Sequence, residues 1–485
     1  MICLTGCSGA SCVSIYAFRE LRLQLGLSLI PMTRAWDAGR AVLRPVVYQW
    51  IEKGTVHHPE GHAQHSVLVA PGLFVQQVNG TLRLSAFNKV IQIIEDVPTY
   101  ERLEACSGFI VGLRINNHLD SACPKPKPTQ IEVWRYCPGT KEYREHLRSM
   151  GVLKHAPLWG YSLRLRLENP ATADARVVIA LMASETRLTG THPSDYWCGT
   201  AHVQRAVHMW HLGRGGTKVA KHEKLTLGKI GYTTSFEFDS DYIFLPSVTD
   251  LHIYSRKDGA HIVSLPSPPR DAPFAFSFRT HEFTETKLVD LKVPLPVTHV
   301  IEAGVSRAED KYDELMHLAA RKAHKPMPHF SKCRMTKNDL VVTCSSGAIS
   351  ILKNYRAVLA SLASVAPRDR EYVAAQSTIL LATGERVDDV ATYGDRIAFR
   401  MSSRRESLVT IDARDLPSLQ LPSTTDKAAP PPRITARVFS VPRPRDYFLP
   451  GAMTMDATGV FCPTQVSTRA YFFGSYEWHE KHLAA

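Results

Sequence analysis

The segment "IEVWRY", residues 131–136, decides the fold because close variants of it return twice further along the chain. "VHMWHL" (207–212) and "LHIYSR" (251–256) repeat its order of apolar, polar, apolar, aromatic and polar side chains. Alternation with a period of two predicts a β-strand whose apolar side chains share one face. The recurrence of one strand type predicts a structural unit that the chain repeats.

An almost wholly apolar segment precedes each of these strands, so the repeated unit contains a pair of strands. The apolar segment predicts a strand buried on both faces, and the alternating segment predicts a strand with two unlike faces. Asn79-Gly80 joins the pair 73–78 and 81–87, and Asn-Gly is a strong hairpin signal because both turn positions need positive φ. The other six pairs are 108–113 with 130–136, 176–182 with 206–212, 242–247 with 250–256, 339–344 with 347–353, 396–401 with 407–413, and 459–463 with 469–475.

The second strands share a register. Two equivalent positions are apolar in six of the seven: Leu82 and Leu84, Ile131 and Val133, Val207 and Met209, Leu251 and Ile253, Ile349 and Ile351, and Val409 and Ile411. Trp134, Trp210 and Tyr254 follow these positions, and we expect them to be packing residues because their period-two neighbours are apolar. A shared register implies one kind of unit throughout.

Repeated antiparallel units with a buried inner strand, each covered by its neighbours, are typical of a β-propeller. We therefore predict a mainly β fold in which residues 66–485 form a WD40-like propeller of seven blades. Six to eight blades stay open, because 272–280 and 286–295 could be strands of a further blade. Capping-box spacing predicts an inserted helix over 306–325.

Residues 1–65 have a different pattern and are predicted to form a short helical N-terminal segment. The apolar residues of 14–30 and 34–53 recur at intervals of three and four, as they do in amphipathic helices. Pro45 would kink or divide the second helix.

The segments around Trp134 and Trp210 resemble the third strand of WD40 repeats, in which an apolar-x-apolar-Trp-Asp pattern is common. Arg135 and His211 stand where that pattern has Asp, so the resemblance is to a degenerate WD40-like propeller. A helical N-terminal segment before a divergent propeller is also similar in layout to fungal F-box propeller proteins, although the F-box itself is not recognisable here. That layout implies a substrate adaptor with ubiquitin-ligase components as partners.

The charge and hydropathy of the chain indicate which classes of partner it could bind. Lys and Arg number 58 against 46 Asp and Glu, a net charge of +12, which attracts nucleic acid, acidic protein or anionic lipid. Basic runs such as 217–224 are short and lack interleaved aromatics, so nucleic acid is a possible partner but is not favoured. The longest apolar run, 177–183, is far too short to cross a bilayer. We expect an intracellular protein, cytoplasmic or nuclear, that does not bind membranes.

The sequence predicts no catalytic residue, cofactor or metal site. The histidine-rich stretch 57–65 could hold zinc or copper, but Pro59 and Gly61 favour an exposed irregular junction. The glycine-rich stretch 213–218 matches neither the dinucleotide fingerprint nor the phosphate loop. No Gly-x-Ser-x-Gly elbow is present.

The loop 183–206 is the candidate binding surface. Tyr196 and Trp197 stand among turn residues there, with His202 and Arg205 nearby, a composition enriched at protein interfaces. We therefore expect a non-catalytic protein-interaction scaffold that binds a partner through its propeller loops, with a ubiquitin-ligase substrate adaptor as a specific form. Two alternatives stay open: an enzyme with its site in the central channel, and a propeller that binds nucleic acid through its basic surface.

Overall fold

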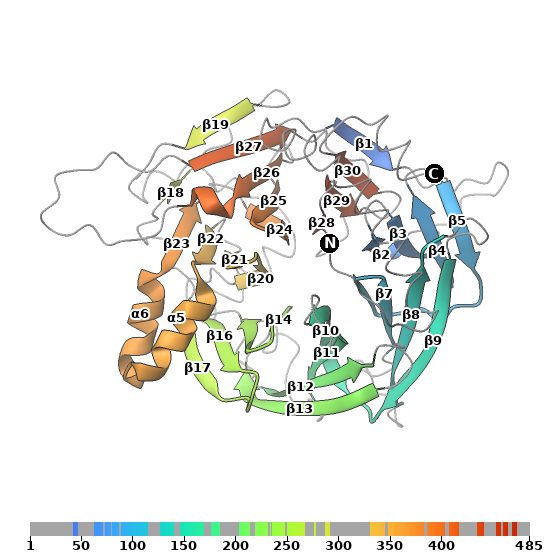
Figure 1. The fold of residues 1–485 in the computed structure, drawn as a ribbon, viewed down its shortest axis with the longest axis horizontal. Helices are drawn as coiled ribbons and strands as arrows, with labels where there is room; N and C mark the ends of the chain where they lie inside the picture. The colour runs from blue at the N-terminus through green and yellow to red at the C-terminus, as the bar shows by residue number, and fades with distance from the viewer. Residues whose placement is uncertain are drawn as a thin grey trace, which may run out of the picture.

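The computed structural model shows strands β1–β30 arranged as seven sheets around a ring (Figure 1). The structure describes residues 42–46, 63–70, 73–78, 80–86, 89–114, 127–139, 146–168, 176–184, 203–213, 219–230, 233, 235–247, 250–266, 276–277, 287–291, 330–344, 348–382, 386–402, 407–416, 434–440, 453–456, 459–463 and 468–472. Among them no helix is long and apolar enough to span a bilayer. The fold is a mainly β propeller, as predicted.

We number the sheets as blades in chain order. Blade 1 contains β2 (Ala63–Ala70), β3 (Leu73–Val78), β4 (Thr81–Ala86) and β5 (Lys89–Ile94), and blade 2 contains β6 (Arg102–Cys106), β7 (Phe109–Arg114), β8 (Thr129–Cys137) and β9 (His146–His155). Blade 3 contains β10 (Trp159–Glu168), β11 (Arg176–Ser184), β12 (Val203–Leu212) and β13 (Val219–Ile230), and blade 4 contains β14 (Glu237–Phe238), β15 (Tyr242–Pro246), β16 (Asp250–Ser255) and β17 (His261–Pro266).

Each of the last three blades includes one strand from a distant part of the chain. Blade 5 contains β20 (Phe330–Met335), β21 (Leu340–Cys344), β22 (Ala348–Leu352), β23 (Thr378–Ala382) and β18 (Phe276–Ser277). Blade 6 contains β24 (Arg386–Tyr393), β25 (Arg396–Ser402), β26 (Ser407–Asp412), β27 (Ile434–Ser440) and β19 (Lys287–Leu291). Blade 7 contains β28 (Thr454–Met455), β29 (Gly459–Pro463), β30 (Thr468–Phe472) and β1 (Val42–Val46).

The seven predicted strand pairs are confirmed, because each forms the second and third strands of one blade counted from the centre of the ring. The third strand of each blade is thus the second member of its predicted pair. The twelve apolar positions that align between these strands are at most 2% exposed. In blades 1 to 5 these side chains pack against the next blade. Val409 and Ile411 of blade 6 instead share one cluster with Ile349 and Ile351 of blade 5, so they face the preceding blade. Trp134, Trp210 and Tyr254 are 7%, 5% and 5% exposed, which confirms their packing role.

The two segments left open as a further blade belong to existing ones. β18 pairs in parallel with β23, and β19 pairs antiparallel with β27, so they are the outermost strands of blades 5 and 6. The described residues therefore contain seven sheets.

The N-terminal segment differs from its prediction where the structure describes it. Residues 42–46, expected within a helix, form strand β1, which pairs with β30 from Val42↔Phe472 to Val46↔Thr468 and closes the ring. Pro45 has no N–H to donate, and it is tolerated because β1 is an edge strand. The rest of 1–62 and the predicted helix 306–325 lie outside the described residues, so the division at residue 65 stays a prediction.

A short helical insertion separates β22 from β23 in blade 5. It contains α5 (Tyr355–Ser361), the 3₁₀ turns η1 (Leu362–Ser364) and η2 (Pro367–Asp369), and α6 (Arg370–Gln376). α6 lies against β17, and the Arg370 guanidinium donates to the carbonyl of Ile262 at 3.4 Å. A further 3₁₀ turn, η3 (Ala413–Asp415), follows β26.

Gly112 of β7 lies against the ring of Tyr100, a 1% exposed residue in the connection that leads into blade 2. A Cβ at Gly112 would lie 2.5–2.6 Å from three ring atoms of Tyr100. The Tyr100 hydroxyl donates to Glu132 at 2.6 Å and accepts from Trp134 Nε1 at 3.0 Å. Any shift of the ring therefore disturbs a buried hydrogen-bonded group.

We expect Gly112→Ala to lower the free energy of unfolding by about 1–3 kcal/mol, because it overpacks this contact. Urea titration of the variant measures the loss. In a Tyr100→Leu background the same substitution should cost much less, since the ring is gone. An equal cost in both backgrounds would show that the Tyr100 contact is not the cause.

Candidate functional site

The predicted protein-binding residues fall in two places. Tyr196, Trp197 and His202 lie outside the described residues, in the connection between β11 and β12. Arg205 is described and is 1% exposed within β12, where it pairs with Gly228 of β13. Because a buried side chain cannot contact a partner, the structure does not support Arg205 as a contact residue.

A belt of ionised side chains links the innermost strands of the blades. We define this charge belt as Glu104 of β6, Arg164 of β10, Glu237 of β14, Lys332 and Arg334 of β20, and Asp389 of β24. The sign of the charge alternates from each blade to the next over blades 2 to 6, since both members on β20 are basic.

The first half of the charge belt joins blades 2 to 5. Arg164 lies 2.7 Å from Glu104 on one side and 3.8 Å from Glu237 on the other. Glu237 in turn lies 3.8 Å from Arg334. The Arg164 Nε also donates to the carbonyl of Phe236 at 2.9 Å, which satisfies a buried acceptor of blade 4.

The second half joins blades 5 to 7. Lys332 Nζ lies 2.9 Å from Asp389 Oδ1, and the other oxygen of Asp389 accepts the N–H of Met453 at 3.1 Å. Asp389 is 1% exposed. Burial opposes its ionisation, but the charges of Lys332, Arg400 and Arg334 outweigh burial and hold the pKa of the Asp389 carboxyl below its usual value.

A carboxyl whose pKa is lowered by folding stabilises the fold above its unfolded pKa of about 3.9, and this stabilisation is lost as the pH falls through the folded pKa. We expect Lys332→Met to remove this contribution. The difference in unfolding free energy between wild type and Lys332→Met should be constant near neutral pH and shrink below about pH 4. Urea titrations across a pH series test this, and a difference that persists unchanged to about pH 2 would contradict it.

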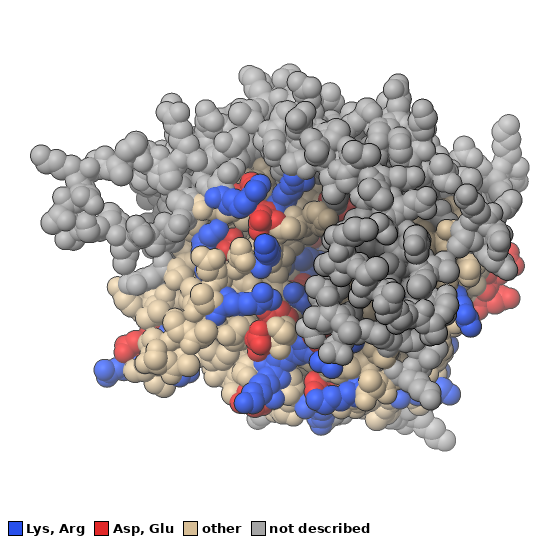
Figure 2. Space-filling view, in the orientation of Figure 1, with Lys and Arg blue, Asp and Glu red and all other residues tan. Residues whose placement is uncertain are grey.

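Basic side chains dominate the exposed charge of the described residues. Exposed Lys and Arg outnumber exposed Asp and Glu there, and examples such as Arg368, Arg414 and Lys221 are 86%, 68% and 62% exposed. Figure 2 shows Lys and Arg spread in an arc over blades 3 to 6 of the visible face, several with an acidic neighbour. Among the described residues of that face, the positive charge is thus distributed and is not gathered in a single patch.

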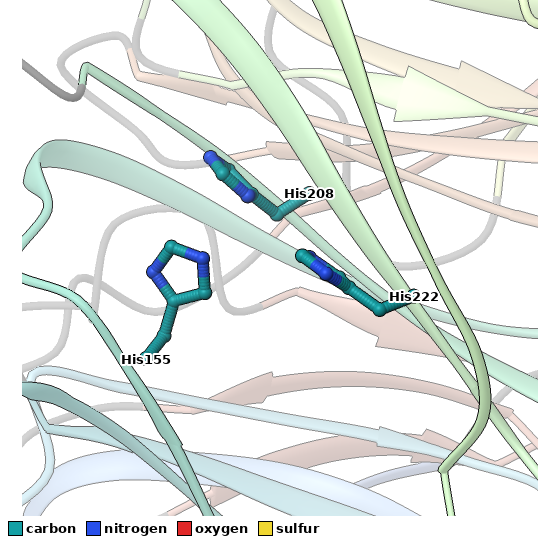
Figure 3. A group of neighbouring side chains, drawn as sticks. All are labelled: His155, His208 and His222. Carbon is teal, nitrogen blue, oxygen red and sulfur yellow. The ribbon is translucent and has the colours of Figure 1, made fainter.

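Three histidines meet at the junction of blades 2 and 3. His155 ends β9 of blade 2, and His208 and His222 lie on β12 and β13 of blade 3 (Figure 3). One ligand nitrogen from each lies within 4.8 Å of the others. The ring centroids of His155 and His208 are 4.6 Å apart, and Trp210 stacks on His222 at 5.0 Å. Imidazole nitrogens so arranged could hold a transition-metal ion.

The sequence did not reveal this cluster. His155 is distant in the chain from His208 and His222, and the three follow no ligand spacing. The histidine-rich stretch 57–65, the candidate metal site that the sequence offers, lies mostly outside the described residues. A signal was present in the strand pairing: His222 stands opposite Trp210 on neighbouring outer strands. The contribution of His155 depends on how blade 2 packs on blade 3.

No protein-family model and no curated protein matches the sequence. Among solved structures the chain is similar to Chaetomium thermophilum Sqt1, bound to the N-terminus of the ribosomal protein L10, with 10% identity and a TM-score of 0.40 over 85% of this chain and 97% of that chain. It is also similar to the computationally designed protein Ika8, with 8% identity and a TM-score of 0.39 over 85% of this chain and 96% of that chain. The fold assignment rests on the strand pairing described above.

Proposed function

We propose that this chain is a non-catalytic scaffold that binds another protein through loops at the rim of the propeller. The observation that carries the proposal is the charge belt. Its carboxylates, Glu104, Glu237 and Asp389, each lie within 4 Å of an Arg or Lys side chain from a neighbouring blade. Groups engaged in this way stabilise the ring and are poorly placed to act as acids or bases, which leaves the rim as the surface for recognition.

The connection between β11 and β12 is the rim loop that we propose as the contact. Both strands are buried within blade 3, so the ends of the loop are held in fixed positions. Tyr196 and Trp197 lie within it. Large aromatic side chains supply much of the binding energy at protein interfaces because they bury a large area at low entropic cost.

The double variant Tyr196→Ala/Trp197→Ala should bind the partner at least about thirtyfold more weakly, the equivalent of a 2 kcal/mol hot spot. The partner is recovered by affinity purification of the full chain, and the affinity is then measured with purified components. Tyr372→Ala is the matched control, because Tyr372 is an aromatic of α6 that is 68% exposed. Equal losses in both variants would contradict the assignment of the loop.

The same purification separates a protein partner from nucleic acid. Retention after nuclease treatment and across moderate salt supports the scaffold. Binding that disappears with nuclease, or that falls by roughly a thousandfold between about 50 and 200 mM salt, would support the nucleic-acid alternative instead.

A ubiquitin-ligase adaptor is the more specific form of this proposal, and it depends on the residues before the propeller. Strand β1 belongs to that segment, so deleting all of 1–65 would also remove the strand that closes blade 7. A variant that begins at residue 41 keeps β1. Recovery of ubiquitin-ligase components by the full chain but not by this variant would support the adaptor, and equal recovery by both would contradict it.

A further inference from the structure

Neighbouring blades 3 and 4 carry equivalent motifs of two histidines and one aromatic residue on their two outer strands. The motif consists of His208, Trp210 and His222 in blade 3, and of His252, Tyr254 and His261 in blade 4. In each blade the second histidine pairs across the strands with the aromatic residue. The ring centroids in these pairs are 5.0 Å and 5.3 Å apart. Blade 4 is therefore an internal comparison for blade 3.

In blade 4 serine hydroxyls satisfy the imidazoles. The two ring nitrogens of His252 lie 3.3 Å from Ser247 Oγ and 2.8 Å from Ser264 Oγ. Ser264 Oγ also lies 2.8 Å from His261 Nε2. A hydrogen-bonded network of this kind explains the histidines of blade 4 without a ligand.

In blade 3 a third imidazole approaches the motif. His155 reaches over from blade 2, and its ring centroid lies 4.6 Å from that of His208 and 5.6 Å from that of His222. Both contacts are edge-on, with interplanar angles of 68° and 67°. Three imidazole rings from two blades thus lie together in blade 3. Opposite the first histidine of the motif, blade 4 has Ser264 and blade 3 has Lys224.

We propose that His155, His208 and His222 bind one zinc ion at the junction of blades 2 and 3, with water as the fourth ligand. Zinc binds imidazole nitrogen at about 2.0–2.1 Å, so two nitrogens of a tetrahedral site lie roughly 3.3 Å apart. The donors lie within 4.8 Å of one another. Small rotations of the half-buried His155 and the exposed His222 close the difference, while His208 is fixed by complete burial.

The surroundings of the site prepare one of the ligands. His155 Nδ1 lies 2.9 Å from the carbonyl of Ala156, so Nδ1 carries the proton and donates it, which leaves Nε2 as the metal-binding nitrogen. Lys224, opposite His208 in the strand register, is the charged residue that weakens cation binding here.

A bound ion would join the outer strand of blade 2 to the two outer strands of blade 3. Such a link stabilises the folded chain by mass action, because the three ligands come together only when the blades are packed. The site is independent of the loop proposed for partner binding.

The test uses the full chain, stripped of metal with a chelator and titrated with zinc chloride in competition with a chromogenic chelator. We expect one high-affinity zinc per chain, and a visible absorption spectrum of tetrahedral cobalt when Co²⁺ replaces zinc. His155→Gln and His222→Gln should each weaken zinc binding by at least about a hundredfold. Both side chains are at least partly exposed, so circular dichroism should confirm that these variants fold.

Two controls make the outcome specific. His261→Gln alters the matching histidine of blade 4 and should leave zinc binding unchanged. A triple variant, His57→Gln/His58→Gln/His62→Gln, removes most of the histidine-rich stretch of the chain and should also leave it unchanged. Zinc that is lost in either control but retained by His222→Gln, or no zinc retained at all, would overturn the proposal.

Discussion

Asp239→Ala is expected to lower the free energy of unfolding by about 3–5 kcal/mol, the largest loss among the substitutions considered. Asp239 is fully buried in the turn between β14 and β15. One carboxylate oxygen accepts the N–H groups of Asp241 and Tyr242, each at 2.7 Å. The other accepts from the Tyr355 hydroxyl at 2.6 Å and from Arg356 Nε at 3.0 Å.

Those four bonds fix the turn of blade 4 and attach it to the start of α5 in blade 5. Alanine leaves two N–H groups, a buried hydroxyl and a guanidinium without their acceptor, and each unpaired buried group carries a desolvation cost. Urea titration followed by intrinsic fluorescence measures the loss. The inserted helices should also become more accessible to protease, since their attachment to blade 4 is gone.

Asp258→Ala is the matched control. Asp258 lies in the turn between β16 and β17 of the same blade, and its carboxylate accepts the N–H of Ala260 at 3.1 Å. The side chain is exposed, so its removal should change stability little. A comparable loss in both variants would mean that turn formation, and not the bonds to Tyr355 and Arg356, explains the effect of Asp239→Ala.

Arg164→Met should cost about 3 kcal/mol, because it removes the cation that two carboxylates of the charge belt share. The Arg164 side chain is 14% exposed, and methionine keeps much of its apolar length. Glu104 and Glu237 would then lie near each other without the intervening charge, and the carbonyl of Phe236 would lose its donor. The substitution therefore weakens the junctions of blade 3 with blades 2 and 4.

Arg176→Met provides the comparison. Arg176 begins β11 in the same blade and lies 3.4 Å from Glu168, but its side chain is 45% exposed. Solvent screens such a pair, so the expected cost is below about 1 kcal/mol. Adding Glu104→Gln to Arg164→Met should recover part of the loss, because it removes the carboxylate charge that Arg164 neutralised at 2.7 Å. No recovery in that double variant would argue against the electrostatic account.

Local patterns in the sequence were sufficient to predict the strand pairs. The hairpin of β3 and β4 could be predicted from residues a few positions apart. The buried positions on the second strand of each predicted pair could be predicted from the alternation of apolar and polar residues. Gly80, at φ +74°, has the backbone conformation that the Asn-Gly signal anticipates. Such features require no knowledge of which blade neighbours which.

The remaining features depend on contacts between distant residues. β1 and β30 pair although more than 400 residues separate them, and β18 pairs with β23 across about 100 residues. The charge belt and the histidine cluster form only after the blades are placed in order. An amphipathic pattern over 34–53 could not reveal that Val42–Val46 would find a strand partner at the other end of the chain, because tertiary pairing overrides local propensity.

The register of β1 and β30 also determines how the ring responds to tension. Val42 pairs with Phe472, so the chain enters β1 and leaves β30 at the same end of the two-strand pair. A force applied just before Val42 and just after Phe472 would act first on that pair of residues, so the hydrogen bonds between β1 and β30 would break one after another. If the chain entered and left at opposite ends of the pair, the same force would act on all of these hydrogen bonds at once. We therefore expect the propeller to open between β1 and β30 of blade 7 under a smaller force than any other blade requires.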